Sequence, residues 1–152
     1  MKKISTMIIA ALILAGSILP AALAQGVTRG HFYSKGDVER IIKRVEDHSD
    51  TFKNVVDKYL DRSYLDGTRK EDNINEQVKQ LEKAIDVMRD KFDRSDRWWE
   101  TRSHVVDVLR QADDVNRIMH NNHFNFKIHA EWASLRYDLN TLAGVYELPK
   151  LK

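Results

Sequence analysis

The stretch INEQVKQLEKAIDVMRDKF (residues 74–92) carries an apolar side chain alternately every four and every three residues. The apolar positions are Ile74, Val78, Leu81, Ile85, Met88 and Phe92. A helix with this spacing gathers these side chains on one face and leaves its charged residues on the other. Such a seam is typical of helices that pack lengthwise against other helices. The stretch therefore predicts a long amphipathic helix within an all-α fold.

Three further stretches show the same helical period. The first predicted helix covers residues 37–64, and the third covers about residues 98–121. The fourth covers residues 128–146, and Leu148-Pro149 is the signal that ends it. No stretch alternates with the two-residue period of a half-buried strand. Four amphipathic helices with short connections favour an antiparallel four-helix bundle. The similar seams of the two halves leave open a bundle built from two αα-hairpins.

Residues that cap helices indicate where these helices begin and end. Ser34 or Asp37 is expected to cap the first helix, and Gly67 suits the left-handed position that follows a helix. Ser95 or Asp96 is the expected cap between the second and third helices. No glycine or proline enforces a break there, so one long bent helix is the alternative. The predicted interior contains Val45, Phe52, Leu81, Ile85, Trp98, Val105, Leu109, Leu135, Leu139 and Leu142.

The first 24 residues have the pattern of a secretory signal peptide. Lys2 and Lys3 precede an apolar run over residues 8–19, and Pro20 and the small-x-small triplet Ala22-Leu23-Ala24 follow it. This order predicts cleavage after Ala24 and export to the periplasm or the cell exterior. The apolar run is shorter than the roughly 20 residues that span a bilayer, although an uncleaved anchor is the alternative. The chain then divides into a signal peptide (1–24), a flexible leader (25–36) and a helical domain (37–149).

Composition excludes several classes of protein. The chain contains no cysteine, so disulfides, thiolate metal sites and covalent haem attachment are ruled out. No lipid-accepting cysteine follows residue 24, and we expect no stable membrane insertion after the signal is removed. Loss of Lys2 and Lys3 leaves equal numbers of basic and acidic residues. No block of Lys and Arg that would follow a phosphate backbone remains, so we expect no binding to nucleic acid.

Two motifs carry a resemblance to other proteins. They are Leu65-Asp66-Gly67-Thr68 and Trp132-x-x-Leu135-Arg136-x-Asp138-Leu139-x-x-Leu142-Ala143-x-x-Tyr146. With them the chain resembles a loose group of uncharacterised exported bacterial all-helical proteins that has no assigned activity. The likeness covers most of the chain after residue 24 and implies a helical fold. It identifies no functional residue.

Histidines are the candidate ligands for a metal or a cofactor. His120, His123 and His129 cluster around the turn between the third and fourth helices, and imidazole suits zinc, copper or nickel. The alternative is that they serve as polar residues at helix ends. His48 falls in the seam between Val45 and Phe52. It is a candidate axial ligand for haem, or alternatively a buried histidine bonded to Ser or Asp of a facing helix.

Catalytic signatures are missing, and two functions remain open. The sequence has no G-x-S-x-G, no catalytic cysteine and no phosphate-binding glycine loop, so we expect no enzymatic activity. Trp98 is expected inside the bundle. Its neighbour Trp99 either covers a turn or contacts a partner, because tryptophan is favoured at binding hot spots. The leading hypothesis is an exported, non-enzymatic module for protein interaction or envelope stress response. The alternative is a haem- or metal-binding bundle.

Overall fold

A computed structural model describes residues 32–152. It contains four α-helices and one short 3-10 helix, and no strand occurs within these residues: α1 (Lys35–Leu60), α2 (Arg69–Arg94), η1 (Trp98–Thr101), α3 (Arg102–Asn121) and α4 (Phe126–Val145). The all-α prediction is confirmed. The predicted signal peptide (1–24) and most of the predicted leader lie outside the described residues.

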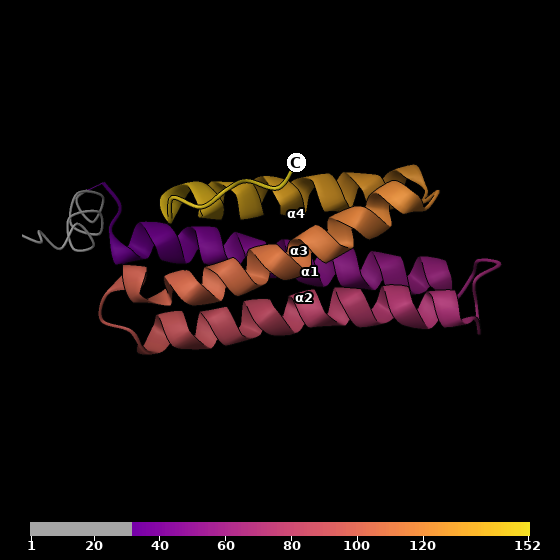
Figure 1. The fold of residues 1–152 in the computed structure, drawn as a ribbon, viewed down its shortest axis with the longest axis horizontal. Coiled ribbons are helices and arrows are strands. Elements are labelled where there is room, and N and C mark those ends of the chain that lie inside the picture. The colour runs from indigo at the N-terminus through magenta and orange to yellow at the C-terminus, as the bar shows by residue number, and fades with distance from the viewer. Residues whose placement is uncertain (1–31) are drawn as a thin grey trace, which may run out of the picture.

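The four helices run back and forth along one common direction, as Figure 1 shows. The closest packing joins α1 to α4 and α2 to α3, whereas α3 and α4 contact each other less than α1 and α2 do. Each helix thus packs more closely against a helix of the other hairpin than against its partner in its own hairpin, α1–α2 or α3–α4. The chain therefore folds as one all-α bundle, in which the two hairpins pack against each other.

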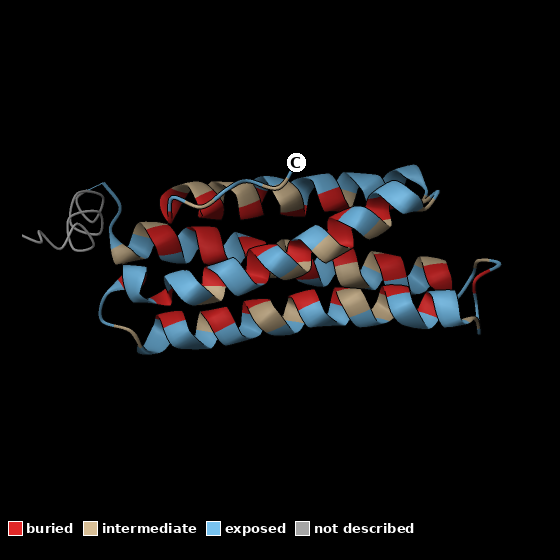
Figure 2. Ribbon diagram, in the orientation of Figure 1, coloured by how far each residue is buried: buried red, intermediate tan, exposed pale blue. Residues whose placement is uncertain are grey.

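The seams of the helices face the bundle axis. Buried residues follow the inner side of every helix and exposed residues the outer side (Figure 2). All ten residues predicted for the interior are buried, among them Val45, Leu135 and Leu139 with no exposed surface. Burial of such side chains removes apolar surface from water and is the main source of stability in a fold of this kind.

The ends of α1 agree only in part with the sequence predictions. Ser34 is the N-cap, and its hydroxyl accepts a hydrogen bond from the Asp37 backbone while the Asp37 carboxylate accepts one from the Ser34 backbone. Hydrogen bonds from Ser34 hold the pKa of Asp37 below its usual value. The helix ends at Leu60, four residues before the predicted end. Gly67 has the expected left-handed φ of 72°, but it lies within the loop and not directly after the helix.

A break separates α2 from α3, so the single bent helix is excluded. Neither Ser95 nor Asp96 caps the helix that follows. The N-cap is Arg97, which makes no side-chain capping bond, and the chain continues through η1 into α3. The Trp98 indole nitrogen, 3.1 Å from the carbonyl oxygen of Tyr33, donates a hydrogen bond to the segment before α1. This bond fixes the start of the helical domain to η1.

The segment after α4 belongs to the folded domain. It turns back at Glu147, whose φ is 55°, and runs along α4 to the C-terminus (Figure 1). The Asn140 side chain accepts a hydrogen bond from the Leu151 backbone at 2.8 Å and donates one to its carbonyl oxygen. The Asn116 amide donates to the main-chain oxygen of Lys152 at 2.9 Å. The first helix thus begins at Lys35, and contacts with the helices extend to Lys152.

Tyr146 joins the end of α4 to the start of η1. Its hydroxyl lies 2.7 Å from the Thr101 hydroxyl and 2.9 Å from the carbonyl oxygen of Trp98, and its ring meets the Trp98 ring edge to face at 5.2 Å. Burial raises the pKa of Tyr146 to about 12, against the smaller lowering effect of the Thr101 hydrogen bond. The folded chain therefore retains this proton over a pH range in which the unfolded chain releases it.

We expect Tyr146 to make the protein sensitive to alkali. Because the folded-state pKa is raised from 10.0 to about 12, the stability that the neutral phenol provides is complete below pH 10 and is lost as the pH rises to 12. The loss amounts to about 2–3 kcal/mol. Urea unfolding followed by circular dichroism at pH 9 and near pH 12 measures it. Tyr146→Phe should lose less stability over this range, and an equal loss in both proteins would contradict the assignment.

Candidate functional site

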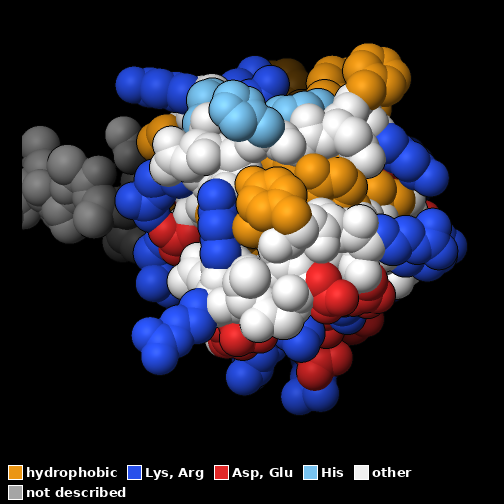
Figure 3. Space-filling view, turned by 90° about the vertical axis from the view of Figure 1, so that its right-hand side faces the viewer, with side chains coloured by type: hydrophobic (Ala, Val, Ile, Leu, Met, Phe, Trp, Pro, Cys, Tyr) orange, Lys and Arg blue, Asp and Glu red, His pale blue; other side chains and the backbone are white. Residues whose placement is uncertain are grey.

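One end of the bundle contains both the α1–α2 turn and the α3–α4 turn (Figure 1). Figure 3 looks onto this end and shows hydrophobic side chains at its centre, histidines above them and Lys and Arg side chains on the flanks. Most of the Asp and Glu side chains in this view lie along the lower edge. The predicted histidine cluster, His120, His123 and His129, belongs to this end because these residues surround the α3–α4 turn.

The three histidines do not form a metal centre in this arrangement. The His120 ring bonds to the carbonyl oxygen of Asn116, one turn earlier in its own helix. The His129 ring lies edge-on to Phe124, with the centroids 6.5 Å apart, and His123 is exposed. Within residues 32–152 no group of three His, Cys, Asp or Glu side chains is placed to hold a metal. Their positions agree with the alternative that they are polar residues at helix ends.

A pocket of about 480 Å³ opens at the same end, beside the histidines. Its two tyrosines and its three cations come from three segments of the chain. Lys58 and Tyr59 belong to α1, Arg62 and Tyr64 to the α1–α2 turn, and Lys127 to α4. Its lining contains no Asp or Glu. Phe126, next to Lys127, is exposed. We call Lys58, Tyr59, Arg62, Tyr64, Phe126 and Lys127 the aromatic–basic end.

The cations of this pocket differ from the salt-bridged cations of the helical faces, although other exposed cations, such as Lys79 and Lys83, also have no salt bridge among the described residues. Of the salt-bridged cations, Arg89 lies between Glu39, Glu46 and Asp93 on the α1–α2 face, and Lys53 pairs with Glu82 at 2.6 Å. For Lys58, Arg62 and Lys127, in contrast, no carboxylate partner lies within salt-bridge distance among the described residues. Three positive charges around one concave surface attract an anion.

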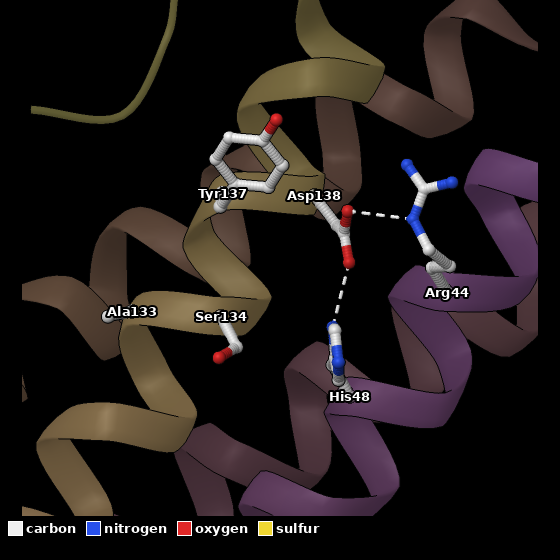
Figure 4. A pocket seen from close by; sticks show the side chains of 6 residues that line it. All are labelled: Arg44, His48, Ala133, Ser134, Tyr137 and Asp138. Atoms are coloured by element: carbon white, nitrogen blue, oxygen red, sulfur yellow. Dashed lines mark hydrogen bonds and ion pairs between the residues drawn. The ribbon is translucent and has the colours of Figure 1, made fainter.

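His48 takes part in an ion cluster between α1 and α4. Asp138 of α4 has a side chain only 2% exposed, and its two carboxylate oxygens point towards α1 (Figure 4). One oxygen accepts a hydrogen bond from Arg44 Nε at 3.0 Å, and the other lies 2.7 Å from His48 Nδ1. A buried carboxylate is tolerated when such donors satisfy it. His48 thus bonds to an Asp of a facing helix, as the predicted alternative had it, but its side chain is not buried.

The prediction that His48 lies in the seam of α1 was wrong by one residue. The buried seam position between Val45 and Phe52 belongs to Ser49, whereas the His48 side chain is 39% exposed. His48 therefore lies at the edge of the bundle, bonded to Asp138, and not at its axis where we expected a haem ligand.

The pocket beside Asp138 brings a serine, a histidine and an aspartate together without linking them. It measures about 500 Å³ and is lined by Arg44, His48, Ala133, Ser134, Tyr137 and Asp138. The Ser134 hydroxyl donates to the Ala130 carbonyl oxygen of its own helix, at 3.2 Å. A nucleophilic serine must instead bond to the histidine. This cluster acts as a link between two helices, because its polar groups bond to one another and to the helix backbone.

Trp99 occupies the opposite end of the bundle from the aromatic–basic end. It is 40% exposed, its ring lies edge-on to that of the buried Trp98, and the Arg97 guanidinium lies over it at 5.9 Å. The expectation of one tryptophan inside and one at the edge is confirmed. Arg97 and Trp98 contact the Trp99 ring, and its role as a partner contact stays a prediction.

Comparison of the chain with protein-family models, with curated proteins and with solved structures finds no match. The resemblance to exported helical proteins therefore stays a prediction. Within residues 32–152, no helix combines the length and apolarity needed to cross a bilayer.

Proposed function

We propose that this protein is an exported, non-enzymatic interaction module of the cell envelope, which binds an anionic partner through its aromatic–basic end. One observation carries the proposal: Lys58, Arg62 and Lys127 surround a pocket that has no carboxylate in its lining. Charges left unpaired in this way are available to a ligand, whereas the charges of Arg44 and Asp138 already satisfy each other.

Exposed aromatic side chains support a binding role. Tyr64 and Phe126 are 84% and 86% exposed, the highest values among the large hydrophobic residues of the described chain. Aromatic side chains provide large contact areas at low cost in conformational entropy. Their position beside three cations makes this end the surface best suited to a partner. A role in envelope stress is one use of such a module.

Binding to defined anionic probes tests the proposal. The probes are poly-L-glutamate, polyphosphate and vesicles that contain phosphatidylglycerol, each measured with the chain from Gln25 and with its Lys58→Gln/Arg62→Gln variant. A matched control, Lys79→Gln/Lys83→Gln, removes two exposed cations from the outer face of α2. We expect at least one probe to bind to the unmodified chain and to the control but weakly to the first variant. Equal behaviour of both variants, or no binding to any probe, would refute the proposal.

Export is tested separately, by the intact mass of the protein from its native host. We expect a chain that begins at Gln25, as the predicted signal peptide implies. A mass that includes residues 1–24 would refute this part and leave the binding experiment unaffected.

A further inference from the structure

The nature of the anionic partner follows from the geometry of the aromatic–basic end, and this inference rests on the proposed function. We infer that the partner is the surface of an anionic phospholipid bilayer, against which the bundle stands end-on. The phosphate groups of the lipids contact Lys58, Arg62 and Lys127, and the rings of Tyr64 and Phe126 enter the interface beside them.

The exposed aromatic residues favour a bilayer over a folded acidic protein. Tyr64 lies in the α1–α2 turn and Phe126 is the first residue of α4, so both project from the turns that close the bundle at this end. Aromatic rings at protein tips are suited to the headgroup region of a membrane, where an apolar body and a polar edge are both accommodated. A projecting ring enters a soft interface without needing a matching cavity.

The cations favour an anionic bilayer over a neutral one. Each Lys or Arg near an anionic membrane surface contributes about 1 kcal/mol, or about fivefold in the partition coefficient. The three cations of the pocket come from α1, from the α1–α2 turn and from α4, so they lie around a single site and act together. Asn125 also lines the pocket, and its side-chain amide nitrogen is an uncharged donor for phosphate oxygens, whereas the Ser63 hydroxyl already donates to the Leu60 carbonyl oxygen.

The α1–α2 face is less suited to an anionic surface than the aromatic–basic end. The α1–α2 face carries Asp50, Glu82 and Asp86, and partial burial together with these neighbouring carboxylates raises the pKa of Asp86. Carboxylates on this face repel an anionic surface, whereas the lining of the pocket at the aromatic–basic end has none. An end-on contact keeps the acidic face away from the bilayer.

Vesicle co-sedimentation tests the inference. The chain from Gln25 is used, because the apolar run 8–19 would itself bind to lipid and because the core lies wholly within residues 35–152. We expect partition into vesicles that contain phosphatidylglycerol, little partition into pure phosphatidylcholine, and a decrease at high salt. Lys58→Gln/Arg62→Gln should lower the partition coefficient about 30-fold, given about 1 kcal/mol for each cation. Lys79→Gln/Lys83→Gln should leave it nearly unchanged.

An environment-sensitive dye tests the orientation. The chain has no cysteine, so Tyr64→Cys and Val87→Cys each provide one labelling site, the first at the aromatic–basic end and the second in the half of α2 farther from that end. We expect a blue-shifted, brighter emission on anionic vesicles for the label at position 64 only. Equal shifts at both positions, or equal binding to neutral and anionic vesicles, would overturn the inference. Binding to poly-L-glutamate or to soluble glycerol phosphate without binding to vesicles would overturn the inference while the proposed function stands.

Discussion

Replacing Leu139 by alanine should lower the free energy of unfolding by about 2–5 kcal/mol. Leu139 has no exposed surface and lies on the inner side of α4, which packs closely against α1. The substitution removes apolar contacts and leaves a cavity that close-packed neighbours fill only in part. Chemical unfolding followed by circular dichroism measures the loss.

Tyr137→Ala is the matched control for Leu139→Ala. Tyr137 precedes Leu139 by two residues on the same helix, but it is exposed, so its truncation should change the unfolding free energy by no more than about 0.5 kcal/mol. If both variants lost similar amounts, the inner and outer faces of α4 would be misassigned.

Removing both partners of Asp138 should cost about 3–5 kcal/mol. In the Arg44→Ala/His48→Ala variant, the Asp138 carboxylate keeps its buried position and loses both of its donors. Loss of either donor alone should cost less, since the other still bonds to one of the oxygens. Chemical unfolding at neutral pH measures the three free energies.

A third substitution separates the burial of charge from the loss of contacts. Adding Asp138→Leu to Arg44→Ala/His48→Ala removes the unpaired carboxylate, and we expect the triple variant to recover most of the lost stability. Replacement of a buried ion pair by apolar side chains is often neutral or stabilising. If the triple variant were no more stable than the double variant, the cost would lie in lost packing and not in the unpaired charge.

The periodicity of the sequence was sufficient to predict the core, but not every polar position in it. The seam over residues 74–92 predicted which side of α2 is buried, because side chains four and three residues apart share one helical face. For α1 the same rule allowed either His48 or Ser49 after Val45. Both residues are polar, so composition did not decide between them. The closely packed α4 accepts Ser49 in the seam and leaves His48 at its edge beside Asp138.

The aromatic–basic end was not predicted, although part of its signal is present in the sequence. Lys58 and Arg62 are four residues apart and Tyr59 lies between them, which predicts a small basic and aromatic surface at the end of α1. The contribution of Lys127 depends on the packing of α4 beside α1. Amphipathic seams establish that helices pack, but they do not determine the order of helices around the bundle. The pocket therefore appears only in the folded chain.

The length of α1 gives the molecule a definite reach. With 26 residues and a rise of about 1.5 Å for each, the helix separates its two ends by about 40 Å. Tyr33, fixed to Trp98, lies at one end, and Lys58 and Arg62 lie at the other. A molecule held at the aromatic–basic end would display its N-terminal segment about 40 Å away from the attachment surface. A fluorescent donor placed at Tyr33 would thus report, by energy transfer to the surface, whether the bundle stands upright or lies flat.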